Sequence, residues 1–235
     1  MPKQNLFSII IPAYNEERRI EKTLKSFYTS FPPQNTEFII VCDGTKDRTE
    51  EIVKKFIKAH KNVHLLSFPN RLGKGGGILK GIKACRGKVI GYVDADSATS
   101  PADYKKIYQT LTSKNLDGAI ASRYLPASRV LVKQPFYRKF LSRGWNFLVR
   151  LLFQIPYTDT QCGAKIFTRK ALLSVSPKMG STGFEFDVEL LWRLKKSGFK
   201  VSEVPTTWAH IEESKFKVSD IIGMFLRLLK VRFAK

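Results

Sequence analysis

The chain has 235 residues, of which 41 are Lys or Arg and 20 are Asp or Glu, so its formal net charge is +21 at neutral pH. This excess of positive charge indicates a polyanionic partner, which can be nucleic acid, an anionic membrane or a phosphorylated substrate. The hydrophobic content of 43% is enough for one substantial core, and we expect a single domain over residues 1–235. The three cysteines, Cys42, Cys85 and Cys162, are too scattered for a disulfide framework or a zinc site.

The sequence shows neither a membrane span nor a secretion signal. The first residues lead directly into an apolar run, without the apolar core and cleavage site of a signal peptide. A spanning helix needs about 18 apolar residues, and the best candidates are interrupted by Arg143, Arg150, Arg227 and Lys230. We therefore expect any contact with a membrane to be peripheral.

Residues 6–123 alternate short β-branched runs with amphipathic stretches. This pattern is typical of an α/β fold with a mostly parallel sheet and helices on both faces. The predicted strands are 7–11, 38–41, 63–68, 89–93 and 118–121. Ligands of such sheets bind beyond the carboxyl ends of the strands, so the polar residues that follow each strand are the first candidates for a functional site.

Polar residues follow the first two predicted strands. Asp43 comes after the second strand, and the first strand is followed by Pro12, Ala13, Tyr14 and Glu16. A nucleotide base needs a donor–acceptor partner and a wall, which Asp43, the Tyr14 ring and the backbone at 12–13 can provide. The alternative is that these residues only form turns.

The segment 70–77, Asn-Arg-Leu-Gly-Lys-Gly-Gly-Gly, is predicted to be a glycine-rich loop that opens a helix. Its bare amides and the Lys74 ammonium are suited to cradle phosphate. The spacing is not that of a P-loop, and the position after the third strand is not that of a dinucleotide fingerprint. A contact with a diphosphate stays open.

Two carboxylates, Asp94 and Asp96, follow the predicted strand 89–93. Alternate residues on an extended backbone point the same way, so both can face one ligand. Two such oxygens suit a hard divalent ion, Mg²⁺ or Mn²⁺, if a substrate diphosphate completes the coordination shell. The alternative is that the pair caps the next helix.

Residues 118–158 contain no Asp or Glu. Within them Tyr137, Phe140, Leu141, Trp145, Leu148 and Leu152 recur at helical spacing, opposite Arg138, Lys139, Ser142, Arg143 and Asn146. This pattern predicts an amphipathic helix over 136–153 that lies in a membrane interface. A second amphipathic helix is predicted over 219–235, with the apolar residues Ile221, Ile222, Phe225, Leu228 and Leu229. The alternative is that both apolar stripes pack on the core.

Six motifs of the sequence resemble those of the inverting glycosyltransferases of family 2, and within that family those of the dolichyl-phosphate glucose and mannose synthases. The motifs are residues 10–16, 43–47, 73–76, 94–96, 159–165 and 186–189. Together they cover nearly the whole chain. Asp-Thr-Gln-Cys-Gly at 159–163 and Ser-Ala-Thr at 97–99 look most like the glucose-type enzymes.

The resemblance implies a glycosyltransferase A-type fold that binds a nucleotide diphosphate, with a donor-binding half over 6–123 and an acceptor half over 124–210. It places Asp43 near the base, Asp94 and Asp96 near the ribose, the diphosphate and the metal, and Arg123 near the phosphates. The implied donor-binding residues are Pro12, Ala13, Tyr14, Glu16, Asp43, Lys74, Asp94, Ala95, Asp96 and Arg123. Arg138 and Ser142, at positions i and i+4 of the predicted helix, match the family's acceptor-phosphate pair.

Asp96, Asp159 and Asp187 are the candidate catalytic residues. Asp159 and Asp187 can orient the sugar or the acceptor, or they can be buried structural acids. The chain departs from the family pattern at Cys42, where the first acid of an Asp-Asp-Gly-Ser motif is usual. It also has Ala98 where mannose-type relatives have a metal-binding Gln, so we expect no third protein ligand to the metal.

The activity that the resemblance implies is metal-dependent, inverting transfer of a hexose from a nucleotide-diphosphate sugar to polyprenyl or dolichyl phosphate, at the cytoplasmic face of a membrane. UDP-glucose is the favoured donor and GDP-mannose the alternative. A basic nucleic-acid-binding module also fits the net charge, but it leaves the acidic pair unexplained, and we expect no nucleic-acid partner. A soluble nucleotidyltransferase fits the acidic pair but has no use for the acid-free amphipathic stretch.

Overall fold

The computed structural model describes residues 6–132, 136–209 and 220–233, and of residues 136–141 and 220–222 it describes the backbone alone. Its centre is a seven-stranded sheet in the order β3-β2-β1-β4-β7-β5-β8. Neighbouring strands are parallel, except that β7 runs antiparallel to β4 and β5. The strands are β1 (Phe7–Ala13), β2 (Thr36–Asp43), β3 (Val63–Phe68), β4 (Val89–Val93), β5 (Gly118–Ser122), β7 (Ala164–Thr168) and β8 (Val201–Pro205). The expected mostly parallel α/β sheet is confirmed.

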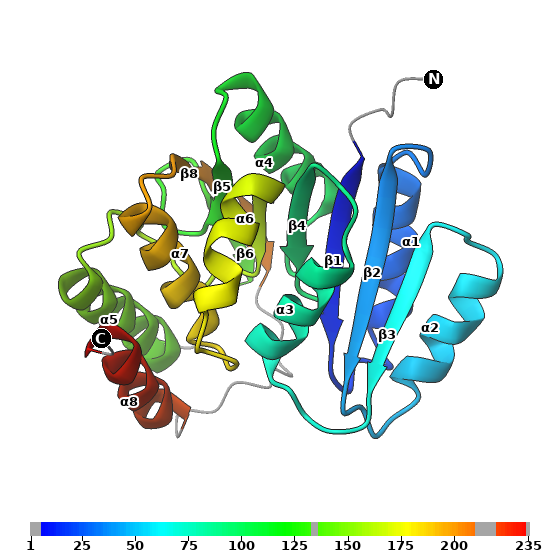
Figure 1. Ribbon diagram of the computed structural model, residues 1–235, viewed down its shortest axis with the longest axis horizontal. Helices are drawn as coiled ribbons and strands as arrows, with labels where there is room; N and C mark the ends of the chain where they lie inside the picture. Colours follow the sequence, from blue (N-terminus) through cyan, green and yellow to red (C-terminus); the bar gives the residue numbers. More distant parts are fainter. Residues whose placement is uncertain (1–5, 133–135, 210–219, 234–235) are drawn as a thin grey trace.

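Helices cover both faces of the sheet (Figure 1). One face carries α1 (Ile20–Ser30), α2 (Thr49–Lys58) and α4 (Pro101–Ser113). The other face carries α3 (Lys74–Ala84), α5 (Phe136–Phe153), α6 (Arg169–Val175), α7 (Phe186–Lys196) and α8 (Asp220–Phe233). Within β1, Ile9 and Ile11 enter the first core and Ile10 enters the second, as the alternation of a strand requires. Because both faces are covered, the strands are nearly continuous apolar runs.

The strand predictions of the first half agree with the structure, and 63–68 and 89–93 agree at both ends. The structure adds a parallel two-stranded ribbon of β6 (Arg129–Val132) and β9 (Thr207–Ala209). All four residues of β6 are exposed, so this strand has no buried face to produce an alternating pattern. Helix α6 has seven residues, which is too short to show a helical repeat, and a 3₁₀ turn, Ser176–Lys178, follows it.

The reversed direction of β7 brings distant loops to one edge of the sheet. Strand β4 ends at Val93, which pairs with Ala164 at the beginning of β7. The loop 159–163 therefore reaches the sheet where Asp94 leaves it. Strand β5 ends at the same edge, directly before Arg123. The candidate residues of both halves thus meet at the carboxyl edge of the parallel strands.

The inner sides of α5 and α8 pack on the core, which corrects part of the sequence interpretation. Trp145, predicted to lie in a membrane interface, is 7% exposed and belongs to the same core cluster as Val149 and Phe153. Leu228 of α8, assigned to the lipid-facing stripe, is fully buried. Both helices are apolar around much of their circumference, so periodicity alone does not tell which side meets the core. The predicted stripe residues Tyr137, Phe140, Leu141, Ile221 and Ile222 lie outside the described side chains.

The outward side of α5 carries two apolar residues outside the predicted stripe, next to Leu148 of that stripe. Phe147 and Leu151 are each 69% exposed, and Leu148 is also exposed. Across the parts of the chain that the structure describes, no helix has the length and apolar content to cross a membrane.

Candidate active site

Asp94 lies directly after β4, at the centre of the site. Its Oδ1 atom is 2.8 Å from the Nζ atom of Lys74, the first residue of α3. Its amide donates a hydrogen bond of 3.2 Å to the carbonyl oxygen of Gly163. A side chain at position 163 would collide with the Asp94 carboxylate. Residue 163 must therefore be glycine to leave room for the Asp94 carboxylate.

Asp96 follows in the turn after β4, and its Oδ1 atom accepts a hydrogen bond of 2.9 Å from the Ala98 amide. Ala95 between the two acids is buried, and its carbonyl oxygen accepts a bond of 2.8 Å from the Thr23 hydroxyl. Burial and the charge of Asp94 raise the pKa of Asp96. The two carboxylates are thus close enough to repel each other, which is the arrangement that a cation relieves.

Asp187, in the first turn of α7, is buried and contacts two lysines. Its Oδ1 atom lies 2.7 Å from Lys165 Nζ, its Oδ2 atom lies 3.5 Å from Lys74 Nζ, and the Tyr92 hydroxyl donates to Oδ1 at 2.5 Å. Burial raises the pKa of Asp187, but the charges of Lys165 and Lys74 outweigh it and hold the pKa below its usual range. Asp187 therefore stays ionised and forms a second ion pair with Lys74, in addition to the pair of Lys74 with Asp94.

Lys74 lies between two acids, Asp94 and Asp187, and is almost fully enclosed. Burial lowers the pKa of Lys74, but the charges of Asp94 and Asp187 raise it by more, so the pKa lies above its usual range. The ammonium is consequently a fixed positive charge beside Asp94, in reach of an anion that binds there.

Arg123, the first residue after β5, forms a two-pronged ion pair with Asp159. The guanidinium Nε and Nη2 atoms donate to Oδ2 and Oδ1 at 2.7 Å and 2.8 Å, and the Arg123 amide donates to Oδ2 at 2.9 Å. Burial raises the pKa of Asp159, but the Arg123 charge and its hydrogen bonds lower it by more. The guanidinium also lies 5.1 Å from the centre of the Trp208 ring in β9. Its position is therefore fixed on two sides.

The loop 159–163 joins these groups. Asp159 holds Arg123, the carbonyl oxygen of Cys162 accepts a bond of 2.6 Å from Lys165 Nζ, and Gly163 lies against Asp94. The loop is itself fixed by Glu203 of β8, which accepts bonds from the Asp159 amide. One loop thus sets the relative positions of an arginine, a buried lysine and the acidic pair.

The loop after β2 forms a separate part of the site. The buried carboxylate of Asp43 accepts hydrogen bonds from the side chain of Arg71 and from the amides of Leu72 and Gly73. The Arg71 guanidinium lies 3.5 Å from the centre of the Tyr14 ring. Asp43 therefore holds the start of the glycine-rich segment, and Arg71 with Tyr14 offers a flat surface of the kind on which a base stacks.

The glycine-rich segment differs from the expected phosphate cradle. Helix α3 begins at Lys74, so the three following glycines are helical and buried. The amides of Leu72 and Gly73 bond to Asp43, and the amide of Gly76 donates to the Thr182 carbonyl at 3.0 Å. These three amides already have protein partners, and the Lys74 ammonium is a positive charge that the segment adds to the site. Its glycines serve close packing instead.

The remaining predicted donor residues shape the loop after β1. Pro12 is half-buried and Ala13 buried at the end of that strand. The Glu16 carboxylate lies 2.7 Å from Arg19, and its amide donates to the Thr49 hydroxyl at 2.7 Å. The latter bond ties the loop after β1, which contains Tyr14, to the start of α2.

The acceptor candidates lie on α5. The Ser142 hydroxyl is 2.7 Å from the Tyr124 hydroxyl, and Tyr124 directly follows Arg123. Asn146 fixes the helix here, because its Oδ1 atom accepts bonds of 3.1 Å and 2.9 Å from the amide and the hydroxyl of Thr160. Arg138 lies on the same helix one turn before Ser142, and its side chain is outside the described residues.

The acidic pair fits a divalent cation. Asp94 and Asp96 supply hard oxygen ligands, and burial together with the charge of Asp94 raises the pKa of Asp96. Within the described ranges, 6–132, 136–209 and 220–233, there is no group of three or more His, Cys, Asp or Glu side chains that could hold a metal.

Sequence reasoning missed several members of the site. Arg71, Lys165 and Gly163 lie inside motifs that were recognised, but their roles depend on contacts across the sheet. Tyr92 looks like an ordinary core residue of β4 until its hydroxyl is seen to bond Asp187. The signal that could have found Lys165 is a lysine within an otherwise apolar strand, since such a charge needs a buried partner.

A carboxylate pair with a fixed lysine and a fixed arginine, at the carboxyl edge of an α/β sheet, is typical of enzyme sites that take a phosphorylated substrate. The model of the glycosyl transferase family 2 matches residues 8–175. The chain belongs to this family and is a glycosyltransferase.

Relatives and solved structures agree with this assignment. Dolichyl-phosphate beta-glucosyltransferases are 33% identical in Dictyostelium discoideum, over 99% of this chain and 76% of that protein, and 31% identical in Homo sapiens, over 88% and 68%. A solved structure of glucosyl-3-phosphoglycerate synthase from Mycobacterium tuberculosis, in complex with Mn²⁺, UDP-glucose and phosphoglyceric acid, has a TM-score of 0.73 at 18% identity, over 97% of this chain and 78% of that chain. At that identity the structural likeness concerns the fold.

Proposed function

We propose that this glycosyltransferase transfers glucose from UDP-glucose to a polyprenyl phosphate of the dolichyl type, with a divalent cation, at a membrane surface. The observation that carries the proposal is the loop 159–163, which holds Arg123 through Asp159 and contacts Asp94 through Gly163. The Arg123 guanidinium lies 5.4 Å from the centre of the Tyr124 ring, and the Tyr124 hydroxyl bonds Ser142. A donor diphosphate at the acidic pair and an acceptor phosphate at α5 would meet at this loop. The names of the relatives, dolichyl-phosphate beta-glucosyltransferases, support glucose and a dolichyl acceptor.

The chemistry requires no strong general base. A phosphate monoester has its second pKa near about 6, so it is already an anionic nucleophile at neutral pH. A phosphate oxygen of the acceptor forms a bond to the anomeric carbon while the bond from that carbon to the diphosphate oxygen breaks. This single displacement inverts the anomeric centre. The work left to the enzyme is alignment and stabilisation of charge.

Each charged group has a role in that step. Lys74, kept ionised by Asp94 and Asp187, balances the charge of the leaving diphosphate. A cation bound to Asp94 and Asp96 would supply further positive charge to the same diphosphate. Arg123, fixed by Asp159, can bind phosphate oxygens in a fork. Asp159 and Asp187 are both buried and bonded to cations, which supports a role in orienting those cations rather than the sugar.

Arg138 and Ser142 are proposed to bind the acceptor phosphate. The Ser142 hydroxyl bonds the Tyr124 hydroxyl, and the Tyr124 ring lies 5.4 Å from the Arg123 guanidinium, which supports a shared phosphate site at this end of α5. Helical spacing of four residues puts Arg138 on the same side of the helix. Arg143, exposed on the same turn, lies 6.0 Å from the Tyr124 ring and adds positive charge.

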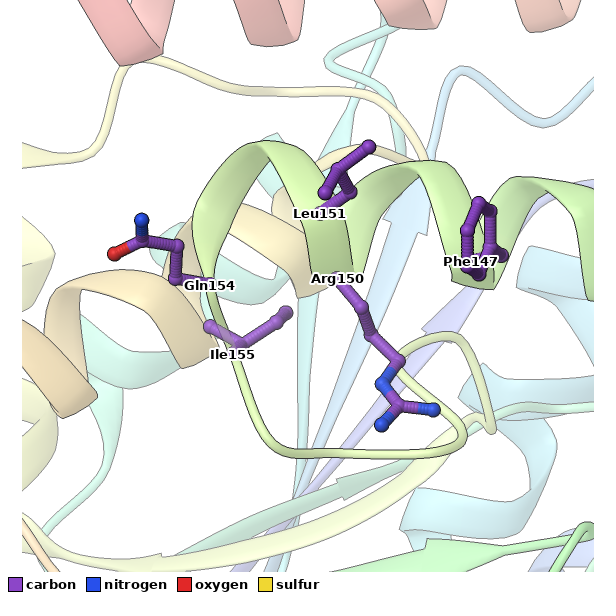
Figure 2. A pocket seen from close by; sticks show the side chains of 5 residues that line it. All are labelled: Phe147, Arg150, Leu151, Gln154 and Ile155. Carbon is purple, nitrogen blue, oxygen red and sulfur yellow. The ribbon is translucent and has the colours of Figure 1, made fainter.

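The outward side of α5 supports contact with a bilayer. Figure 2 shows Phe147, Arg150 and Leu151 standing out from the helix, where they line an open hollow with Gln154 and Ile155. Exposed apolar side chains beside an exposed arginine are the combination that binds anionic lipid. Strand β6 adds Val130, Leu131 and Val132, all exposed, to this half of the molecule.

The test is a donor panel. The protein is incubated with radiolabelled UDP-glucose, UDP-galactose, GDP-mannose or UDP-N-acetylglucosamine, with dolichyl phosphate and Mn²⁺, and label in the organic phase is counted. We expect label from UDP-glucose, and loss of this label when dolichol replaces dolichyl phosphate or when EDTA is added. Label from GDP-mannose instead would replace the donor in this proposal, and no label from any donor would overturn it.

A further inference from the structure

An ion pair between the half-exposed Arg227 and the buried Glu185 connects α8 with the beginning of α7. The Glu185 carboxylate is fully buried, and Arg227 donates to it from Nε at 2.8 Å and from Nη2 at 3.1 Å. The Gly183 amide also donates to Glu185, at 3.1 Å. The pair therefore fixes the loop before α7 and the beginning of α7. The arginine belongs to α8, which comes more than forty residues later in the chain.

The loop that this pair fixes packs on the first turn of α3. The Thr182 carbonyl accepts the Gly76 amide at 3.0 Å. A side chain at position 73 would collide with the Thr182 carbonyl, and one at position 75 would collide with Phe186. The two segments thus touch backbone to backbone, and a shift of one displaces the other because interiors are close-packed.

The first turn of α3 carries Lys74, and the first turn of α7 carries both Phe186 and Asp187. Lys74 pairs with Asp94 at 2.8 Å and with Asp187 at 3.5 Å. Glu185 directly precedes Phe186 and Asp187. Its hold on the loop therefore acts both on the first turn of α3, which carries Lys74, and on Asp187, which pairs with Lys74.

We propose that Glu185 and Arg227 are positioning residues for the donor site. Their ion pair holds the loop 180–185 against α3 and so keeps Lys74 beside Asp94. The inference rests on the proposed function, because it takes Lys74 as a contact of the donor diphosphate. It assigns α8 a role in donor binding, although α8 itself lies away from the acidic pair.

The first test needs no substrate. Hydrogen exchange is measured over the α3 amides, including Gly76, in wild type, Arg227→Gln and Lys230→Gln. Lys230 is a matched control, since it is exposed on the same helix and forms no ion pair among the described residues. We expect exchange at least about tenfold faster in Arg227→Gln and unchanged in Lys230→Gln. Equal exchange in both variants would overturn the proposal.

The second test is a double-mutant cycle on nucleotide affinity. UDP is titrated in the presence of Mn²⁺ into wild type, Arg227→Gln, Lys74→Met and the double variant. We expect Arg227→Gln to weaken UDP binding by about three- to tenfold in wild type and by less than about twofold in the Lys74→Met background. An undiminished effect without Lys74 would show that the ion pair does not act through this lysine.

Failure of this inference is distinguishable from failure of the proposed function. A wild-type protein that binds GDP in place of UDP contradicts the proposed donor, and the cycle is then run with GDP. Arg227→Gln leaves the Glu185 carboxylate buried without its cation and can unfold the protein. The variant E185Q/R227Q removes both charges, and R227K keeps one charged bond. We expect the first to lose UDP affinity like Arg227→Gln and the second to restore it in part, whereas wild-type affinity in both would overturn the positioning role.

Discussion

The charged side chains of the strand-end site and those on the outward side of α5 differ in burial and in pairing. At the strand ends Lys165 is buried, Lys74 and Arg123 are mostly buried, and each of the three has a buried or half-buried aspartate partner. On α5, Arg143 and Arg150 are exposed beside exposed apolar side chains. Burial fixes the orientation of a charged side chain, because a buried ion pair tolerates few geometries. Exposed cations are not fixed in this way, and they attract an anionic surface through their number and proximity.

This difference separates two kinds of function. Fixed charges suit a reaction in which a leaving diphosphate must be met at one place. Exposed cations with apolar neighbours suit a surface such as a bilayer, which has no fixed shape. Substitutions at the strand ends should therefore abolish an activity or unfold the protein, and those on the outward side of α5 should change affinity by degrees.

The largest effect is expected for Asp96→Asn, which removes one charge of the acidic pair and keeps an acceptor for the Ala98 amide. We expect transfer to fall at least about a thousandfold, because a proposed metal ligand and its charge are lost, while the melting temperature stays within about 2 °C. Label transfer and thermal unfolding check this. Glu51→Gln, an exposed charge on α2, is the control and should be silent. Near-normal turnover of folded Asp96→Asn would remove Asp96 from the site.

Asp159→Asn should destabilise the protein by about 3–5 kcal/mol at neutral pH, because Arg123 is left buried without its anion. The pH dependence follows from the lowered pKa of Asp159. Stability from this pair is fully present above the unfolded pKa of aspartate, near about 4, and is lost as the pH falls towards the lower folded value. The stability gap between wild type and variant, measured by urea unfolding from pH 7 to pH 3, should therefore narrow in acid. A gap that widens in acid would contradict the ion pair.

These two residues also show how far the sequence leads. The acids at the ends of β1, β2 and β4 could be placed, because runs of β-branched residues mark the strands and the carboxyl edge follows from the fold. The contact between loop 159–163 and Asp94 could not, since it depends on the antiparallel direction of β7. No local pattern encodes the direction of one strand.

The helices show a second limit. A helix was predicted over 219–235 and the structure has α8 over Asp220–Phe233, but the side that packs on the core was not predicted. An apolar stripe has the same period whether it meets a core or a bilayer. Trp145 was therefore assigned to the interface on composition, and its burial became visible only from the packing of α5 beside α7 and α8.

Leu228→Ala should cost about 2–4 kcal/mol, because it leaves a cavity in the core beneath α8, where Leu228 is fully buried. Leu226→Ala is the matched control on the same helix, 54% exposed, and should change stability by less than about 0.5 kcal/mol. Urea unfolding of both variants checks this. Equal small effects would mean that α8 does not pack on the core, and the stripe would return to the lipid-facing interpretation.

The smallest effect, and the one that bears most on the membrane, is expected for the pair F147S/L151S. Both side chains are 69% exposed, so their removal leaves no cavity and should leave the melting temperature unchanged. If they enter the apolar part of a bilayer, their loss should weaken binding to anionic liposomes by at least about tenfold, since burying one such side chain is worth about 1.5–3 kcal/mol.

The control for this prediction is Leu173→Ser on α6, which removes an apolar side chain that is 40% exposed in another part of the fold. Flotation with liposomes of mixed phosphatidylcholine and phosphatidylserine measures the binding of all three proteins. Exposed apolar residues act additively and Arg143 and Arg150 remain, so F147S/L151S should bind weakly and lose its remaining binding at high salt. Unchanged flotation of F147S/L151S, or an equal loss in Leu173→Ser, would show that the outward side of α5 is not where this protein meets lipid.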